Sequence, residues 1–534
     1  MENELQQFRS RNDLSRREFL QYAGALGITA TTAGAIWSSP ALASPKHGGH
    51  LRVGAEGGAT TDSLDPRRAI GTAQSTVIIH SMFDTLTNLD ENSTPVPRIA
   101  ESWEATPDAL TWRFKIRKDI EFHNGKTLDI NDIISTYAYL DHDANTHGDG
   151  RNIAGSIADM KADGDYLVIT QEAPNADLPT LLSGYSLTIG PAGTEGSQWE
   201  KGIGTGPYKL VNFEPGVNAE VERNPNHYDP NEGFFDSVEF PNIQDQAARA
   251  SALRTDAVDY ITRPDPKTAH LLAKEPGLLV VDAGGNRHYT MPMRSSDEPL
   301  SNTDLQLALK YSVDREELLK KILGGWGYVG NDIPIGRAQR YVNKDLPQRG
   351  PDPDKAQFHL KKAGMSSFDV DLYASDAAWT GAVDAAQLVT ETAKKGGVNI
   401  TVKRAPADGY WSEVWMQKPW CLSYWGGRPT EDWMFTVGYS ETDDGKPSGW
   451  NESYFTHDRF NELLRAARGE LDDDKRRSMY YEMQEICHNE CGTVIPMFSS
   501  FVDAYKDTLR HANPLRSTFD LDDFKLPRQW WFET

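Results

Sequence analysis

Residues 424–435 combine aromatic and charged side chains in the way that a small-molecule site requires. They read Tyr-Trp-Gly-Gly-Arg-Pro-Thr-Glu-Asp-Trp-Met-Phe and follow an apolar run, residues 420–422, that indicates a buried strand. Two glycines interrupt the strand, and Pro429 cannot donate a ladder hydrogen bond, so a loop begins here. In α/β folds, ligands bind beyond the carboxyl ends of strands. Aromatic walls with a few fixed charges suit a small polar organic ligand.

The charges of this stretch are asymmetric. Arg428 and Asp432 lie four residues apart with Pro429 between them, so they need not satisfy each other as a helical pair would. A buried charge without a partner is costly, so each needs one from the ligand or from the protein. If the ligand supplies both partners, it is a zwitterion or a peptide-like molecule.

Strands and helices alternate in the segments that lead to this loop. Residues 368–372 and 398–402 alternate as strands, whereas residues 381–395 and 410–416 are helical in pattern. With the run at residues 420–422 this gives a β-α-β-α-β order, which predicts an α/β fold with a parallel sheet. The loop then lies at a strand's carboxyl end.

The rest of the chain also mixes strands and helices. Asp314 and Asp352 are expected to cap helices, and the tail at residues 530–532 is expected to pack back on the body. Further strands are predicted at residues 49–53, 110–116, 166–170, 208–213 and 289–294, and helices at residues 72–86, 129–140, 458–469 and 473–488.

Length and charge bound the possible functions. The 534 residues are too many for one core, and two to four domains are expected. The mean hydropathy of −0.58 and the lack of a long apolar run exclude a membrane-spanning body. A net charge of −23 argues against nucleic acid or an anionic membrane as a partner.

The N-terminus resembles a twin-arginine export signal. Arg16-Arg17 precede a mildly apolar run, residues 22–37, and the sequence Ala41-Leu42-Ala43 resembles a cleavage site. Gln21 stands where a lysine is usual. Residues 1–43 are therefore interpreted as a signal, removed near Ala43 after export of the folded chain to the periplasm; the alternative is an N-terminal helix.

Metal and catalytic signatures are weak or missing. Cys421, Cys487 and Cys491 make no disulfide framework and are interpreted as buried thiols. His142, Asp143 and His147 could bind a metal, but a solvated loop is the favoured interpretation. The chain has no H-E-x-x-H or G-x-S-x-G motif. We therefore expect no catalytic residue, no metal and no cofactor.

Several stretches resemble one family, the extracytoplasmic solute-binding proteins of peptide, dipeptide and nickel ABC transporters (family 5). The similar stretches appear in the family's order over residues 49–501. They are Ser63-Leu64-Asp65-Pro66, residues 97–103, residues 112–125, residues 129–132, residues 204–210, Arg223-Asn224-Pro225, Asp314-Arg315 and residues 352–364.

The resemblance implies a type II periplasmic-binding-protein fold, in which two lobes close on a hinge and one lobe carries an inserted domain. The expected division is lobe 1 at residues 44–81, 190–285 and 505–534, the inserted domain at residues 82–189, and lobe 2 at residues 286–504. It also implies a binding protein rather than an enzyme, acting with an ABC permease on a small peptide or amino-acid-like ligand, as a monomer.

The resemblance also suggests site residues. In peptide-binding members an aspartate after a glycine-rich loop holds the ligand's amino group, and Asp432 occupies that place. Arg428, Trp433 and Arg294 depart from the family pattern and suggest a smaller, more charged ligand. The two arginines are candidates for a bidentate carboxylate clamp. The full ligand-binding set is Asp432, Arg428, Trp425, Arg294, Trp433, Trp450, Tyr424 and Gly426.

Structural alternatives remain open at this stage. Asp432 could cap a helix, either arginine could bridge the lobes, and Trp433 and Trp450 could be core residues. Two other function classes also remain: a periplasmic hydrolase on a similar frame, and a peptide-binding chaperone or sensor.

Overall fold

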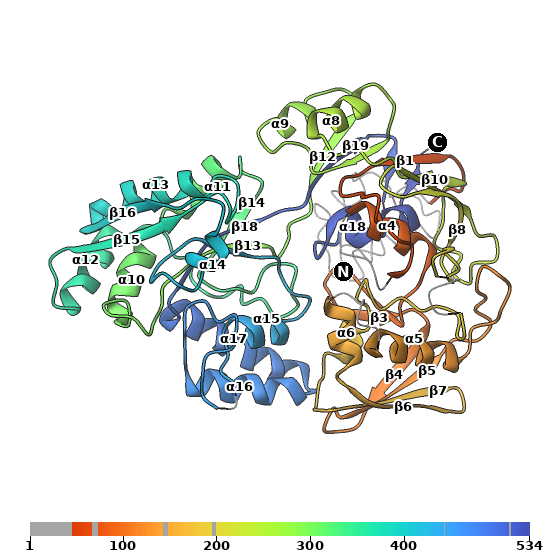
Figure 1. Ribbon diagram of the computed structural model, residues 1–534, viewed down its shortest axis with the longest axis horizontal. Helices are drawn as coiled ribbons and strands as arrows, with labels where there is room; N and C mark the ends of the chain where they lie inside the picture. Colours follow the sequence, from red (N-terminus) through yellow and green to blue (C-terminus); the bar gives the residue numbers. More distant parts are fainter. Residues whose placement is uncertain are drawn as a thin grey trace, which may run out of the picture.

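The computed structural model describes residues 45–66, 73–142, 148–194, 199–442, 444–511 and 514–533. The signal predicted at residues 1–43 lies outside these ranges, as do Asp143 and His147. Strands and helices form two lobes, with a smaller unit attached to the first (Figure 1). The predicted mixed α/β class is confirmed. None of the described helices is both long and apolar enough to cross a membrane.

Lobe 1 is built on a seven-stranded sheet that collects strands from distant parts of the chain. β1 is parallel to its two neighbours, β10 and β11, and the other pairs are antiparallel. In spatial order the strands are β12 (Leu278–Asp282), β19 (Val502–Lys506), β11 (Tyr260–Thr262), β1 (His50–Gly54), β10 (Ser237–Glu239), β9 (Asn218–Arg223) and β8 (Tyr208–Glu214). Its helices are α4 (Ala73–Met82), α8 (Gln246–Arg254), α9 (Ala269–Leu272), α18 (Asp520–Phe524) and α19 (Leu526–Gln529).

Two short antiparallel strand pairs lie outside the main sheets, the first beside the inserted unit and the second on lobe 1. They pair β2 (Thr87–Leu89) with β3 (Pro95–Pro97) and β20 (Leu509–Arg510) with β21 (Trp531–Phe532). Trp530, next to β21, is fully buried in the lobe 1 core, so the tail does pack back on the body.

The inserted unit is an antiparallel four-stranded sheet covered by helices (Figure 1). Trp112, Phe114 and Ile116 alternate on the buried face of β5, as their spacing predicts. The strand order is β4 (Ala100–Ala105), β5 (Thr111–Ile116), β7 (Tyr166–Gln171) and β6 (Ile157–Asp163). The helices are α5 (Ile130–His142), α6 (Gly148–Ala154) and α7 (Leu178–Leu181).

Lobe 2 contains both antiparallel and parallel pairs. Its four-stranded sheet, β14 (Gly327–Val329), β18 (Thr493–Ser499), β13 (His288–Pro292) and β17 (Ser423–Trp425), is entirely antiparallel. The parallel pair is β15 (Phe368–Ala374) with β16 (Val398–Arg404), and a parallel bridge joins Tyr373 to Cys421. The predicted parallel order is therefore right for β15, β16 and the run at residues 420–422, which bridges β15 through Cys421. β17 continues that run and pairs antiparallel with β13.

Helices surround these strands and begin where the sequence places their caps. The carboxylates of Asp314 and Asp352 accept the backbone N–H groups of Glu317 and Lys355 at 3.0 and 2.9 Å. The helices are α10 (Thr303–Tyr311), α11 (Arg315–Ile322), α12 (Pro353–Lys362), α13 (Ala382–Ala393), the 3₁₀ turn η2 (Lys394–Gly396), α14 (Tyr410–Glu413), α15 (Glu431–Gly438), α16 (Asp458–Gly469) and α17 (Asp473–Glu490).

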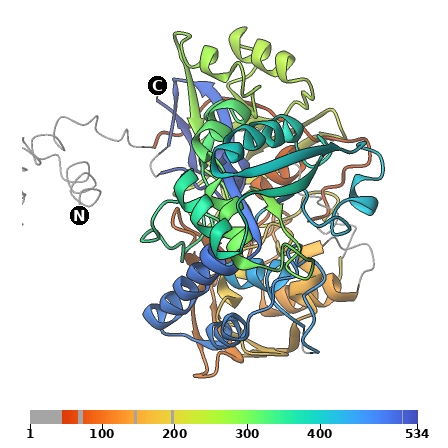
Figure 2. The same cartoon turned by 90° about the vertical axis from the view of Figure 1, so that its left-hand side faces the viewer.

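Two crossing segments connect the lobes and pair with each other. The chain leaves lobe 1 through residues 283–287 and returns through residues 500–501, between β18 and β19. In Figure 2 the blue strand β18 lies among green strands of lobe 2. Ala283 N donates to Phe501 O, and Phe501 N donates to Gly284 O at 2.7 Å. A Cβ at Gly285 would lie 2.6 Å from the carbonyl oxygen of Ser499, so this close approach requires glycine.

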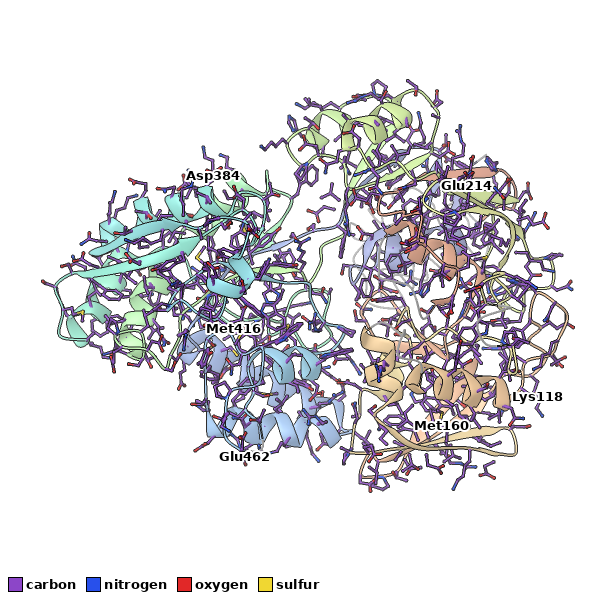
Figure 3. All side chains as sticks on the ribbon, viewed as in Figure 1. Lys118, Met160, Glu214, Asp384, Met416 and Glu462 are labelled. Atoms are coloured by element: carbon purple, nitrogen blue, oxygen red, sulfur yellow. The ribbon has the colours of Figure 1, made fainter. Side chains whose placement is uncertain are left out.

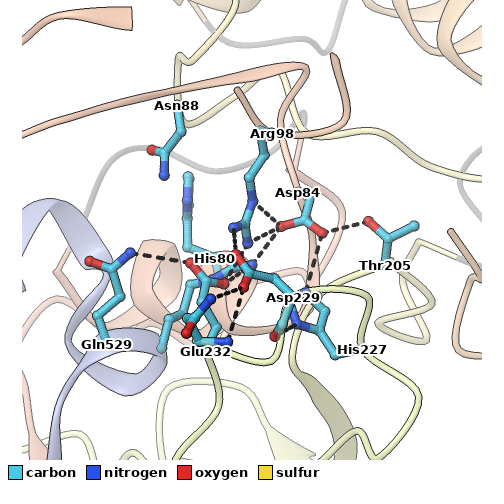
Figure 4. Close-up of polar contacts among 12 residues, drawn as sticks. His80, Asp84, Asn88, Arg98, Thr205, His227, Asp229, Glu232 and Gln529 are labelled. Carbon is cyan, nitrogen blue, oxygen red and sulfur yellow. Dashed lines mark hydrogen bonds and ion pairs between the residues drawn. The ribbon is translucent and has the colours of Figure 1, made fainter. Parts of the chain in front are cut away.

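A buried group of two acids and two arginines holds the C-terminal segment on lobe 1 (Figure 4). Arg98 Nη2 lies 2.6 Å from both Asp84 Oδ1 and Glu232 Oε2. Arg528 Nη2 lies 2.6 Å from the same Asp84 oxygen, and its Nε donates to Glu232 Oε2 at 2.7 Å. The four charges sum to zero, which lets all four side chains be buried.

We predict that Arg528→Met destabilises the protein by about 3–5 kcal/mol, because it leaves two buried carboxylates with one guanidinium. The urea midpoint of unfolding measures the loss. Arg459→Met is the matched control: its side chain is 47% exposed and pairs with Glu482 at the surface, so its loss should shift the midpoint far less. Equal midpoints for the two variants would show that the buried group is not a major source of stability.

Candidate functional site

A cavity of about 360 Å³ lies where β17 ends. Its walls come from α14 and the residues after it, from β17, from the loop that follows β17, and from residues 450–452. The lining residues are Trp411, Trp415, Ser423, Tyr424, Trp425, Gly426, Arg428, Trp450 and Glu452. A pocket of this size, mostly aromatic with a few polar groups, is typical of small-molecule sites.

Five aromatic rings form a continuous arc around the cavity. The Trp415 ring stands nearly perpendicular to Trp411 (5.8 Å between centroids, 76°) and to Trp450 (6.4 Å, 80°). Trp411 also meets Tyr424 edge to face, and Trp450 lies beside Trp425. Trp411 and Trp450 are 41% and 50% exposed. Large aromatic side chains gathered at one exposed place mark an interaction site rather than a core.

The carboxylate of Glu452 lies against the rings and is almost fully buried, at 6% exposure. Its Oε1 accepts hydrogen bonds from Trp415 Nε1 and Ser423 Oγ, both at 2.5 Å. Its Oε2 accepts from Trp425 Nε1 at 3.1 Å and from Thr290 Oγ1 at 3.3 Å. Burial raises the pKa of Glu452, and the four donors oppose that effect because they favour the ionised form.

Two guanidinium groups stack on rings of the same arc. Arg428 Cζ lies 5.4 Å from the Trp425 ring and 5.9 Å from the Trp450 ring. Arg287, in the crossing segment, lies 4.9 Å from the Tyr424 ring. The side-chain amide of Asn286 donates to the carbonyl oxygen of Arg428 at 3.0 Å and so ties the loop to the crossing segment. The rings therefore accept cations on their faces.

The structure brings five of the eight sequence-predicted residues to this cavity: Tyr424, Trp425, Gly426, Arg428 and Trp450. The strand runs on through Trp425, so the loop begins at Gly426. The other three predicted residues lie elsewhere.

Asp432 does not line the cavity. It sits in the first turn of α15, whose cap is Thr430, and its carboxylate pairs with Arg468 Nε at 3.0 Å. Burial raises the pKa of Asp432, and Arg468 acts in the opposite direction. The structure thus gives Asp432, whose side chain is 14% exposed, a cationic partner from α16 within the protein. Its expected pairing with a ligand cation stays a prediction.

Trp433 lines a second, smaller cavity of about 60 Å³ together with Pro429. The opposite walls of this cavity come from the inserted unit, including Ile153 and Leu181, and from the C-terminal segment of lobe 1, including Lys525. The loop after β17 therefore separates the aromatic cavity from a space between the lobes.

Arg294 has a structural role in lobe 2. Its Nε lies 3.3 Å from Asp297 Oδ2, and its Nη1 donates to the carbonyl oxygens of Met416 and Gln417. Met416 is labelled in Figure 3, in the segment that follows α14. Arg294 thus supports the chain next to Trp415, without lining the cavity itself.

The structure adds four residues that the sequence interpretation missed: Glu452, Trp411, Trp415 and Arg287. Trp411 and Trp415 are spaced i, i+4, so the sequence already indicated that their rings lie on one side of a helical segment. Glu452 follows Trp450 by two residues. The role of Glu452 was not visible, because its four donors come from Thr290, from Trp415 and from β17.

Metal and thiol chemistry find no support in the described ranges. Cys421, Cys487 and Cys491 are buried and unpaired, as expected. No group of three or more His, Cys, Asp or Glu side chains that could hold a metal occurs among the residues that the structure describes.

The family of bacterial extracellular solute-binding proteins, family 5, matches residues 94–446 of the chain through its middle region. The glutathione-binding protein GsiB of Shigella flexneri serotype 5b (strain 8401) is 24% identical over 472 residues, which cover 85% of this chain and 90% of that protein.

Two solved structures share the fold. The Helicobacter pylori periplasmic binding protein DppA, in complex with the peptide STSA, has a TM-score of 0.67 at 20% identity and covers 92% of this chain and 99% of its own. The A. tumefaciens R10 protein AgaA, in complex with agropinic acid, has a TM-score of 0.68 at 21% identity and covers 91% and 99%. The resemblance found in the sequence is confirmed, and the chain belongs to the bacterial extracellular solute-binding proteins of family 5.

Proposed function

We propose that the solute carried by this binding protein of an ABC importer is a small peptide or amino-acid-like zwitterion, held between two closing lobes. One observation carries the proposal: the exposed aromatic arc has a guanidinium, Arg428, and a buried carboxylate, Glu452, on the same cavity. Arg428 would clamp the ligand's carboxylate and Glu452 would balance its cation, the role first expected of Asp432. Relatives that bind glutathione, a peptide and agropinic acid support a ligand of this class.

The closing motion rests on the paired crossing segments. The proposed division assigns residues 44–81, 190–285 and 505–534 to lobe 1, residues 82–189 to the inserted domain and residues 286–504 to lobe 2. Sheet membership supports this division, except that β19 (Val502–Lys506) pairs with strands of lobe 1 and favours a return at residues 500–501. Because the segments hydrogen-bond to each other, they would bend together as one hinge.

Export through the twin-arginine pathway, with cleavage near Ala43, is part of the proposal and rests on Arg16-Arg17 before an apolar run. The expected partners are the ligand and the membrane permease of the importer, with the binding protein acting as a monomer.

A hydrolase or a peptide-binding chaperone would behave differently. A hydrolase would turn over added ligand, and a chaperone would accept many peptides without closing on any small molecule.

The decisive experiment identifies the ligand. Mass spectrometry of what co-purifies with the protein should find a small zwitterion released unchanged on denaturation. A thermal-shift screen of dipeptides, amino-acid conjugates, betaines and metal chelates should find the same class. A ligand at 100 times its Kd should stabilise the protein by about 2.7 kcal/mol. Recovery of cleavage products alone would show that the protein is a hydrolase and not a binding protein.

We predict that Arg428→Met weakens binding of the zwitterion by about 2–5 kcal/mol, the range for removing one side of a buried charge pair. Arg428→Lys should restore only part of the affinity, because the bidentate fork is lost. Calorimetric titration measures both. Asp432→Asn is the matched control and should bind normally, since Asp432 pairs with Arg468. Normal binding by Arg428→Met together with lost binding by Asp432→Asn would restore the sequence-based assignment.

Closure is tested by small-angle scattering. We predict a smaller radius of gyration with saturating ligand than without, because, among the described residues, the chain passes between the two lobes only at the paired crossing segments. A tight ligand that leaves the radius unchanged would contradict lobe closure, while leaving the ligand class intact.

The export proposal predicts that replacing Arg16 and Arg17 with lysine leaves the precursor in the cytoplasm. Cell fractionation measures the distribution, and the N-terminus of the exported wild-type protein should lie near Ser44. A normal periplasmic yield from the double variant would exclude the twin-arginine pathway.

A further inference from the structure

Glu452 differs in its partners from Asp84, Glu232 and Asp332, which are also buried. Asp503 and Glu431 are buried with neutral donors too, but neither lines the aromatic cavity. Asp84 and Glu232 lie against Arg98 and Arg528, and Asp332 lies against Arg315 at 2.6 Å. The donors to Glu452 are instead two indoles and two hydroxyls, all neutral. Within the described ranges, no lysine, arginine or histidine makes an ion pair with Glu452. A buried negative charge held only by neutral groups leaves an attraction for a cation in the adjoining cavity.

The hydrogen bonds indicate that Glu452 carries that charge. Indole N–H groups only donate, so Trp415 and Trp425 each require an acceptor oxygen from this side chain. A protonated carboxyl would have to donate its own O–H to the hydroxyl of Ser423 or Thr290. The ionised form has no such proton and accepts a hydrogen bond from both hydroxyls. Four donors therefore match a carboxylate with two acceptor positions on each oxygen.

The same four bonds also limit what kind of cation can bind. Both oxygens of Glu452 are already occupied, so the carboxylate offers charge but little remaining hydrogen-bonding capacity. The other nitrogen groups at the cavity, on Arg428 and the tryptophans, are donors only. A primary ammonium brings three N–H groups, and the hydroxyl oxygens of Ser423 and Tyr424 are the two side-chain acceptors left for them at the cavity. A methylated ammonium carries the same charge with fewer N–H groups or none.

The ring geometry fits this cation. Trp411, Trp415 and Trp450 meet at nearly right angles and so form three sides of a box. Aromatic boxes bind quaternary and methylated ammonium groups through cation–π attraction. Two of the rings of the arc, Trp425 and Trp450, already lie against the guanidinium of Arg428.

We infer that the ligand is a betaine-like zwitterion, with a methylated ammonium inside the box of Trp411, Trp415 and Trp450 beside Glu452, and a carboxylate on Arg428. The inference rests on the proposed function and narrows it from zwitterions in general to methylated ones. A carboxylate on the same ligand would lie against Arg428, and its attraction to the guanidinium would offset the repulsion between the ligand's cation and Arg428.

The test is a methylation series measured by calorimetric titration with the full-length mature protein. The probes are glycine, N-methylglycine, N,N-dimethylglycine, glycine betaine, proline betaine, carnitine and the dipeptide Ala-Ala. Affinity should rise with each methyl group, with glycine betaine at least about tenfold tighter than glycine. Tighter binding of glycine or Ala-Ala than of any betaine overturns the inference and leaves the proposed function standing. No binding by any zwitterion overturns both.

Two variants distinguish an effect on binding in the aromatic box from an effect on folding. Glu452→Gln should weaken glycine betaine binding by about tenfold or more, since it removes the charge. Because the amide cannot accept all four donors, this variant could misfold, so Trp450→Leu provides a second test on an exposed ring. It should also lose the preference for methylated probes. Phe358→Leu, on a ring 57% exposed on α12, is the control and should change nothing. An unchanged preference in Trp450→Leu overturns the inference.

The pH profile provides an independent readout. Because burial raises the pKa of Glu452, its charge is lost, as pH falls, at a higher pH than the charge of an ordinary glutamate. Betaine affinity should fall with it. The other titratable groups that face Glu452 are Cys421, Tyr410 and Tyr439, and burial raises the pKa of each away from this range. Arg428 stays charged. A profile that remains pH-dependent in Glu452→Gln overturns the assignment of the charge to Glu452.

Discussion

The aromatic cavity depends on one constraint, the burial of the Glu452 carboxylate. A carboxylate removed from water must receive hydrogen bonds, and here they come from β13 through Thr290, from β17 through Ser423 and Trp425, and from Trp415. These donors lie far apart in the sequence, so satisfying one side chain fixes the relative positions of three segments. The Trp415 and Trp425 rings are oriented by the same bonds that hold their nitrogens. The walls of the cavity and its negative charge thus have a common origin.

Elsewhere in the molecule the buried acids serve to join parts of the fold. Asp84 and Glu232 bring together Arg98, at the entrance to the inserted unit, and Arg528, in the C-terminal segment (Figure 4). Each of these carboxylates meets a guanidinium, so its charge is used within the protein. Glu452 meets neutral donors only, as the buried Asp503 and Glu431 also do, and of these three acids only Glu452 lines the aromatic cavity. Its place at the cavity together with its neutral partners distinguishes it from Asp84 and Glu232.

The sequence predicted the fold and five of the residues that line the candidate cavity, because local signals decide them. Alternation identified β5, caps identified α11 and α12, and the Gly-Gly-Arg-Pro turn located the cavity loop. The sequence did not show that α15 begins at Glu431 and brings Asp432 next to Arg468, 36 positions further along the chain. Glu452 was missed for the same reason: its donors are brought together by the antiparallel pairing of β13 with β17, which the sequence pattern did not predict.

The hinge and the site share residues, and this connects binding to closure. Asn286, in the first crossing segment, holds the carbonyl oxygen of Arg428, and its neighbour Arg287 stacks on Tyr424. On the other side of the loop, Pro429 and Trp433 face the space that the inserted unit and the C-terminal segment complete. A ligand carboxylate bound by Arg428 would therefore pull on this loop. One end of the loop is attached to the hinge through Asn286, and the other end, at Pro429 and Trp433, faces lobe 1. Since lobe 2 alone supplies the rings, Glu452 and Arg428, lobe 2 can select the ligand, and lobe 1 contributes by enclosing it.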